Sequence, residues 1–179
     1  MTEQKLIRSQ SVFSAVPGSF GPLGNVRANG CGAIALYNVL RLLGYTVEYG
    51  ELLREMRMHW PRATLLGGIL GSNPFYLLGL LRRKKGLALT FYGVRNRADA
   101  GRVAKCHDVY LNLYLYRWGA HYTAAVYRKQ GLFVCNDPST VDYGAYFEQV
   151  KARFMVVVGI DRHRRISRSG SFLLGTGRR

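Results

Sequence analysis

The chain has 179 residues, of which 48% are hydrophobic and 20% are charged, a balance that suits one globular domain with its own core. Its net charge of +16 suits an anionic partner, but no RNP-like or helix-turn-helix signature is present, so we expect no specific nucleic-acid recognition. The three widely spaced cysteines exclude a disulfide framework and a zinc site. No apolar run has transmembrane or signal-peptide character, which indicates a cytoplasmic protein, and no motif calls for a metal or cofactor.

The first half of the chain has helical patterns. Prolines and glycines between residues 17 and 24 predict an irregular arm. Gly44 is expected to end the first helix, Trp60-Pro61 the second, and Ser72 or Asn73 to cap the third. Apolar spacing therefore predicts helices over 31–43, 48–58 and 74–85.

The second half has strand patterns. Apolar and polar residues alternate strictly over 109–116, which is a strong signal for a half-buried strand. Turns near residues 118 and 130 predict an antiparallel meander with the strands that follow. The expected strands are 87–92, 109–116, 120–127, 132–136 and 154–160, with short helices over 97–104 and 143–150. Helices followed by antiparallel strands predict an α+β fold in which the helix of Cys31 packs on the sheet.

The last residues form a basic segment. Residues 161–179 contain six arginines and one aspartate, a net charge of +5, among serines and glycines. We therefore expect a folded domain over 1–160 and a flexible tail over 161–179 that is able to hold an anionic partner, or that only keeps the protein soluble.

Cys31 is the candidate nucleophile. It begins a predicted helix, where unpaired backbone N–H groups and the helix dipole favour a thiolate. The glycines on either side leave room for a substrate backbone. The alternative is a buried, small apolar residue, which is what most free cysteines are. Cys31 is a nucleophile only if a base lies beside it, so the choice between the two depends on finding that base.

Three of the four histidines are poor candidates for that base. His59 lies at a predicted helix end, where an exposed capping role is expected, and His163 lies in the basic tail. His107 belongs to Cys106-His107-Asp108, whose neighbouring side chains would point to opposite faces of an extended segment and so would not converge.

His121 is the better base because its strand leads into a hairpin that ends in an aspartate. A hairpin closing at residues 129 and 130 pairs positions whose numbers sum to about 259, which puts His121 opposite Pro138. Asp137 would then lie within reach of the imidazole, where a carboxylate fixes the tautomer and stabilises the imidazolium.

Three segments in this order resemble the motifs of a bacterial family. Gly30-Cys31-Gly32-Ala33, Gly119-Ala120-His121-Tyr122 and Asn136-Asp137-Pro138 are similar to those of papain-like cysteine peptidases of the double-glycine leader peptidase group, which process bacteriocins. The resemblance covers residues 25–160. It implies a papain-like fold, with N-terminal helices packed on a C-terminal antiparallel sheet, and cleavage of a peptide or protein after a Gly-Gly-type site.

The resemblance also implies the role of each site residue. Cys31 is the expected nucleophile, His121 the base and acid, and Asp137 the residue that orients the imidazole. Asn25 occupies the position where the family has an amide side chain, usually glutamine, that forms the oxyanion hole with the Cys31 N–H. Asparagine is one methylene shorter.

Two alternatives to hydrolysis remain open. An acyl or peptidyl transferase would use the same fold and thioester with an amine acceptor, and a non-catalytic binding module would keep the fold alone. If the chain is an enzyme, the Cys31 thiol and the His121 ring should approach within about 3 to 4.5 Å, whereas a Cys31 buried away from solvent, or a His121 on the opposite face of the sheet, would contradict an enzyme. Cys106 and Cys135 are expected to be unpaired, interior and structural.

Overall fold

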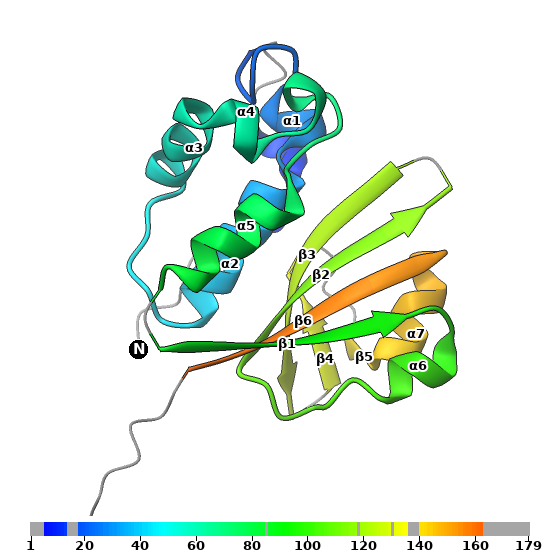
Figure 1. Ribbon diagram of the computed structural model, residues 1–179. Coiled ribbons are helices and arrows are strands. Elements are labelled where there is room, and N and C mark those ends of the chain that lie inside the picture. The colour runs from blue at the N-terminus through cyan, green and yellow to red at the C-terminus, as the bar shows by residue number, and fades with distance from the viewer. Residues whose placement is uncertain are drawn as a thin grey trace, which may run out of the picture.

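The computed structural model describes residues 6–13, 18–84, 86–117, 119–129, 131–135 and 140–162. In this part of the chain, a six-stranded antiparallel sheet has the N-terminal helices beside one face and two later helices beside the other (Figure 1). The expected α+β class is confirmed. Most of the helices and strands are short.

The helical elements are η1 (Gln10–Val12), α1 (Val26–Asn29), α2 (Cys31–Leu42), α3 (Tyr49–Met58), α4 (Trp60–Ala63), η2 (Leu66–Gly68), α5 (Pro74–Arg82), α6 (Arg97–Gly101) and α7 (Tyr143–Gln149). The strands are β1 (Leu87–Val94), β2 (Val109–Tyr116), β3 (Gly119–Arg128), β4 (Gly131–Val134), β5 (Thr140–Val141) and β6 (Phe154–Arg162).

Helix α2 is the central helix of the N-terminal half. Every residue from Cys31 to Leu40 is buried, because its sequence is apolar or small on all sides and it packs between the sheet and the other helices. The helix stops as predicted at Gly44, which has a φ of +82° and is followed by a bond from the Tyr45 N–H to the Leu40 carbonyl of 2.9 Å.

The other predicted helices form with small differences at their ends. The Asn73 side chain caps α5 by accepting a bond from the Phe75 N–H of 3.0 Å, and Pro74 begins the helix. His59 is exposed at the C-terminus of α3, as expected. The second helix ends just before Trp60-Pro61, as predicted, and the separate short helix α4 begins at Trp60, because proline fits the first turn of a helix.

The sheet has the strand order β1-β6-β2-β3-β4-β5. The predicted meander of β2, β3 and β4 is confirmed, and β6 lies between β1 and β2. Ala125 pairs with Val134, which is the predicted hairpin register, and the Cys135 N–H continues it with a bond of 2.8 Å to the Ala124 carbonyl. Residues 136–139, which include Asp137, lie outside the described residues.

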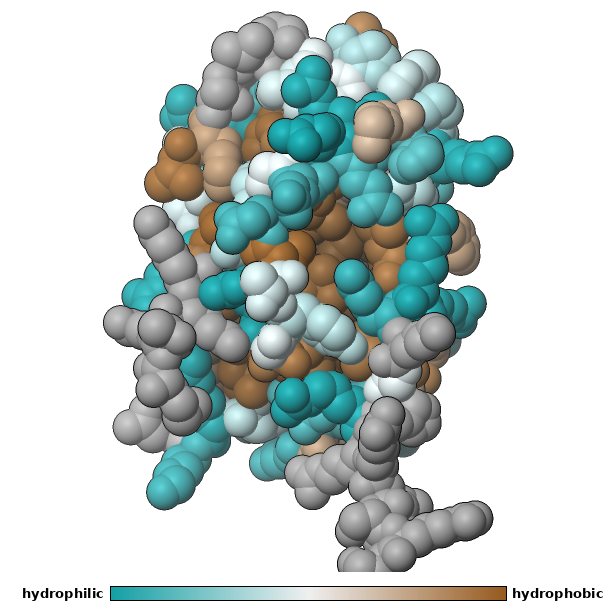
Figure 2. Space-filling view, turned by 90° about the vertical axis from the view of Figure 1, so that its left-hand side faces the viewer, coloured by the Kyte–Doolittle hydropathy of each residue, from teal (hydrophilic) through white to brown (hydrophobic). Residues whose placement is uncertain are grey.

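Two apolar cores lie on opposite faces of the sheet. The first contains α2 together with alternate residues of the strands, among them Tyr122 and Ala124 of β3. The second contains Ala125 of β3 and buried residues of α6 and α7. The first core is rimmed by partly buried apolar side chains, and Figure 2 shows apolar side chains gathered at the centre of one face of the molecule, framed by polar ones.

Strand β6 extends past the boundary that the charge pattern predicts. Asp161 and Arg162 belong to the strand and pair with Ala88 and Leu87 of β1, because the aspartate side chain has partners in the fold and the ladder continues. The assignment of these two residues to the tail is therefore wrong. Residues 163–179, the rest of the expected tail, lie outside the described residues.

Candidate active site around Cys31

Cys31 is the first residue of α2 and is 6% exposed. The helix N-terminus lies against β3, so that backbone groups of Tyr122, Gly32 and Cys31 itself form hydrogen bonds to the thiol. Burial raises the pKa of the Cys31 thiol above its usual value, and these backbone hydrogen bonds oppose the rise without cancelling it. The thiol is therefore protonated at neutral pH in this arrangement.

Asn25 lies one short helix before Cys31. Its side-chain oxygen caps α1 by accepting a hydrogen bond of 2.8 Å from the Ala28 N–H, and its own N–H donates to the Asn29 side chain at 3.2 Å. The Asn29 amide in turn donates to the Ile69 carbonyl at 2.6 Å. These bonds hold the turn between α1 and α2 and use the Asn25 oxygen locally. Its role in an oxyanion hole stays a prediction.

His121 lies on the other face of β3. It pairs directly with Tyr114 of β2, and the two rings lie 5.6 Å apart between centroids. Tyr114 packs against the second core, beside Tyr146 of α7, whereas Tyr122 belongs to the first core with Cys31. Burial lowers the pKa of His121 below its usual value, which favours the neutral ring.

The structure does not bring the Cys31 thiol and the His121 ring into contact. Among the described residues no hydrogen bond joins them, so the expected approach is not observed, and the buried thiol and the ring on the opposite face contradict a catalytic pair in this conformation. Strand alternation is the reason: the thiol contacts the backbone of Tyr122, and the side chain before it points to the opposite face. Cys31 of α2 and His121 of β3 therefore lie near the same stretch of β3, with their reactive groups on opposite sides of the sheet.

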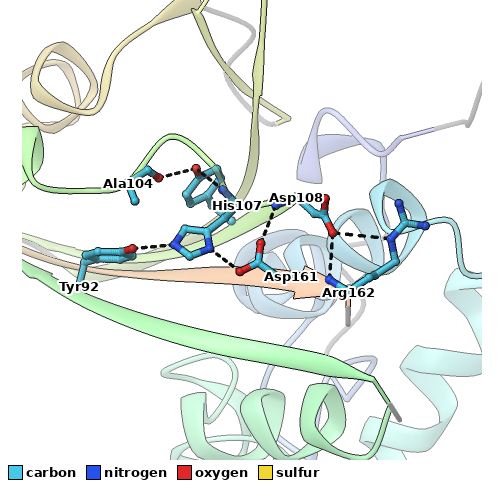
Figure 3. A network of polar contacts seen from close by, with 7 residues as sticks. Tyr92, Ala104, His107, Asp108, Asp161 and Arg162 are labelled. Atoms are coloured by element: carbon cyan, nitrogen blue, oxygen red, sulfur yellow. Dashed lines mark hydrogen bonds and ion pairs between the residues drawn. The ribbon is translucent and has the colours of Figure 1, made fainter. Parts of the chain in front are cut away.

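His107 has its own network at the end of β6 (Figure 3). The ring is buried, its Nδ1 lies 2.7 Å from Asp161 Oδ2, and its Nε2 lies 2.6 Å from the Tyr92 hydroxyl. Asp108 turns instead to Arg162, whose backbone N–H donates to it at 2.9 Å. Cys106 is exposed. The prediction that Cys106, His107 and Asp108 do not converge is confirmed, and the network ties the loop before β2 to β1 and β6.

The three cysteines are unpaired, but only one of the two expected to be structural is interior. Cys135 is fully buried, and burial raises the pKa of its thiol to about 12. Cys106 lies in the turn before β2 and is exposed, so the expectation that it is an interior residue is wrong. The residue lies outside the strand because β2 begins only at Val109, and a side chain in a turn has no sheet face to cover it.

Ser72 and Tyr122 complete the surroundings of Cys31, and sequence patterns did not single them out as site residues. Ser72 is 1% exposed, and its hydroxyl has no hydrogen-bond partner among the described residues. The Tyr122 hydroxyl donates to the Ser72 carbonyl at 3.1 Å. Gly32 lies next to Ser72, where a Cβ would overlap the serine hydroxyl. The glycine after the cysteine was the one visible signal of this close approach.

A separate cavity of 170 Å³ lies away from Cys31, between α6 and α7. Arg97, Lys105, Tyr127 and Asp142 are among the residues that line it. Arg97 also pairs with Glu148 at 3.2 Å, and Asp142 caps α7, so both charged groups have structural partners. This cavity contains none of the predicted site residues.

Comparison with known proteins does not extend this description. No protein-family model matches the chain, and no curated protein matches it. Within the described part of the chain, no helix has the length and apolar character needed to cross a membrane.

Proposed function

We propose that this chain is a papain-like cysteine peptidase or amidase that cleaves a peptide bond through an acyl-thioester on Cys31. The observation that carries the proposal is the packing of Cys31, the first residue of α2, in one apolar core with Tyr122, the residue that follows His121. It supports a catalytic pair because the N-terminus of α2 lies beside the strand position of the candidate base. Asp137 is proposed to orient the imidazole.

The proposed reaction uses neutral partners that become an ion pair. His121 takes the thiol proton as the Cys31 Sγ bonds to the substrate carbonyl carbon, and the carbonyl π electrons move to oxygen. When the electron pair on the oxygen re-forms the carbonyl, the C–N bond breaks, and the amine leaves with the proton from His121. Water then attacks the thioester and releases the acid. With an amine acceptor in place of water, the same thioester gives transfer.

Catalysis in this form requires the His121 ring to move from its present face of β3 to the side on which the Cys31 thiol lies. Successive residues of a strand are roughly 3.3 Å apart, so the His121 backbone is close to the thiol and the change is local. Contact with an imidazolium would also lower the pKa of the Cys31 thiol, which burial now raises. The proposal therefore includes a rearrangement at the start of β3 when a substrate binds.

A second candidate is a non-catalytic binding module, and one observation favours it. The thiol is buried and protonated, and the His121 ring packs on Tyr114 at the opposite face. A chain that had lost catalysis would keep α2 as a core helix and would need no approach between the two groups.

The rate at which iodoacetamide alkylates Cys31 at pH 7 separates the two candidates. The measurement uses a Cys106→Ser background, because Cys106 is the exposed thiol, and mass spectrometry to locate the label. If His121 activates Cys31, His121→Ala lowers the rate by about 10²-fold, the lower end of what a positioned base contributes. Equal rates in both proteins, no faster than a cysteine in an unfolded peptide, would favour the binding module.

A cleavage assay then separates hydrolysis from transfer. Peptides that contain a Gly-Gly site are incubated with the protein, with and without an added amine, and the products are identified by mass spectrometry. Acid products alone indicate a peptidase, and amide products that appear only with the amine indicate a transferase.

A further inference from the structure

A buried hydroxyl without a partner lies at the first turn of α2. Ser72 is 1% exposed, and its Oγ forms no hydrogen bond with any described residue. Leaving a buried donor unpaired costs about 1 to 3 kcal/mol, and folded proteins rarely keep such groups without a reason. A ligand that supplies a hydrogen-bond acceptor at this point would remove the cost.

The backbone around Ser72 is held from both sides. Ser72 forms an isolated antiparallel bridge with Thr64, and the N–H of the next residue, Asn73, donates to the Ala63 carbonyl at 2.9 Å. From the sheet, the Tyr122 hydroxyl donates to the Ser72 carbonyl at 3.1 Å. The backbone that carries the hydroxyl is therefore held relative to β3 as well as to the helices, which is part of what a preorganised donor needs.

The Ser72 hydroxyl lies against Gly32, in the first turn of α2. A Cβ on Gly32 would overlap both the Oγ and the Cβ of Ser72. Side chains of a helix point toward its N-terminus, so Ser72 occupies space above the first turn, where N–H groups lack intrahelical partners. The backbone bonds of Cys31 and Gly32 to the thiol lie in this same turn. The twelve-residue helix adds its positive dipole end there.

We propose that the Ser72 hydroxyl is an oxyanion donor of this site, acting together with the Cys31 N–H. The inference rests on the proposed function. When the Sγ–C bond forms, the carbonyl π pair moves to oxygen, and Ser72 donates a hydrogen bond to that oxygen while keeping its own proton. Ser72 takes the place expected for Asn25, whose side-chain oxygen already caps α1.

The test compares two reagents that differ in their need for an oxyanion site. N-Acetyl-glycyl-glycinal adds reversibly to a thiol and forms a hemithioacetal whose oxygen would occupy the site. Iodoacetamide alkylates Sγ by displacement at a CH₂ group, with no such oxygen. In a Cys106→Ser background, the aldehyde's affinity is measured as its protection of Cys31 from alkylation.

Ser72→Ala should lower the affinity for the aldehyde by about 10²-fold, the effect of removing one oxyanion-hole donor. The rate of alkylation should stay within about twofold, and the melting temperature should stay equal or rise, because an unpartnered hydroxyl has been removed. Ser72→Cys, with a weaker donor, should give an intermediate affinity.

One control variant and one variant of the competing candidate assign the effect to Ser72. Thr64→Val removes the other hydroxyl of the same bridge, which donates to the Trp60 carbonyl at 2.9 Å, and should lower stability without changing the aldehyde's affinity. Asn25→Ser keeps a capping oxygen and removes the amide of the competing candidate, so a loss of affinity confined to this variant would assign the oxyanion donor to Asn25. Equal affinities of wild type and Ser72→Ala, or a loss in Asn25→Ser alone, would overturn the inference. A wild type that does not bind the aldehyde and alkylates no faster than a free thiol overturns the proposed function itself.

Discussion

The two faces of the sheet differ in how their buried polar groups are satisfied. On the face of α6 and α7, the polar groups form a closed network: Tyr143 donates to Asn112 at 3.0 Å, the Asn112 amide donates to Thr123 at 3.2 Å, and Thr123 bonds to Tyr146 at 3.0 Å. His107 is likewise bonded at both ring nitrogens. This face uses polar side chains to hold its helices and loops in place.

The N-terminal half is mixed, because the buried side chains of Asn38 and Thr64 are hydrogen-bonded and several others are not. Within the described residues, all the buried side-chain atoms without a hydrogen-bond partner come from this half: Arg41 Nε, Tyr49 Oη, Ser72 Oγ and Tyr76 Oη. Local rules of packing and satisfaction are most often broken where a protein functions. The unpartnered atoms thus lie in the same half of the chain as Cys31, and the hydrogen-bonded face of α6 and α7 is the scaffold of the fold.

The largest expected effect tests the chemistry of the N-terminal half. Cys31→Ala should reduce peptide cleavage and aldehyde binding by about 10³-fold or more, as when the nucleophile of an acyl-transfer site is removed. Its melting temperature should change little, because alanine fills most of the same space. Undiminished cleavage by the variant would show that another residue is the nucleophile, and labelling of Cys106 or Cys135 would then identify it.

Two truncations test where the scaffold ends. Deleting residues 161–179 removes Asp161, the partner of His107, and should lower the free energy of unfolding by about 3 kcal/mol, a value for a hydrogen bond to a charged group. Deleting residues 163–179 keeps Asp161 and Arg162 and should change the free energy of unfolding little. Urea unfolding of both proteins makes the comparison, and equal losses would place structural contacts beyond Arg162.

The shorter deletion also tests the basic tail. If the tail recruits an anionic partner, its removal should weaken binding at low salt and have little effect at high salt, since exposed charges are screened over about 10 Å at 0.1 M. A titration against a polyanion across salt concentrations measures this. Equal affinities of the full and truncated proteins at every salt concentration would leave the tail without a binding role.

Paired tyrosine variants sharpen the contrast between the faces. Tyr143→Phe leaves the Asn112 carbonyl oxygen without its donor and should lower the free energy of unfolding by about 1 to 2 kcal/mol. Tyr76→Phe removes a hydroxyl that has no partner and should be neutral or stabilising. Both are measured by urea unfolding, and similar losses in the two variants would contradict the contrast.

The smallest expected effect is a pH dependence with two limbs. The pKa of His121 is lowered in the folded state, so its stabilisation is complete above about pH 6.5 and is lost as the pH falls through the folded-state value. The pKa of Cys31 is raised, so its contribution is present below about pH 8.5 and is lost as the pH rises. His121→Gln should reduce the acid limb alone in melting curves. An unchanged acid limb would contradict the burial of its ring.

The local elements of this fold could be predicted from the sequence. Alternation located β2, helical spacing located α2, and Gly44 marked its end, because these signals arise within a few residues of chain. The register of the β3–β4 hairpin was also predictable, since a short turn fixes which residues pair. For the candidate site, the sequence determined that Cys31 would begin a helix and His121 would lie near the start of a strand.

Only the tertiary structure decided which groups meet. Alternation puts His121 and Tyr122 on opposite faces of β3, but which face receives α2 depends on the packing of the whole helical half against the sheet. The position of β6 between β1 and β2, and with it the pairing of His107 with Asp161, joins residues 54 positions apart. Ser72 reaches Gly32 in the same way. Such contacts depend on long-range packing, which no pattern of a few neighbouring residues contains.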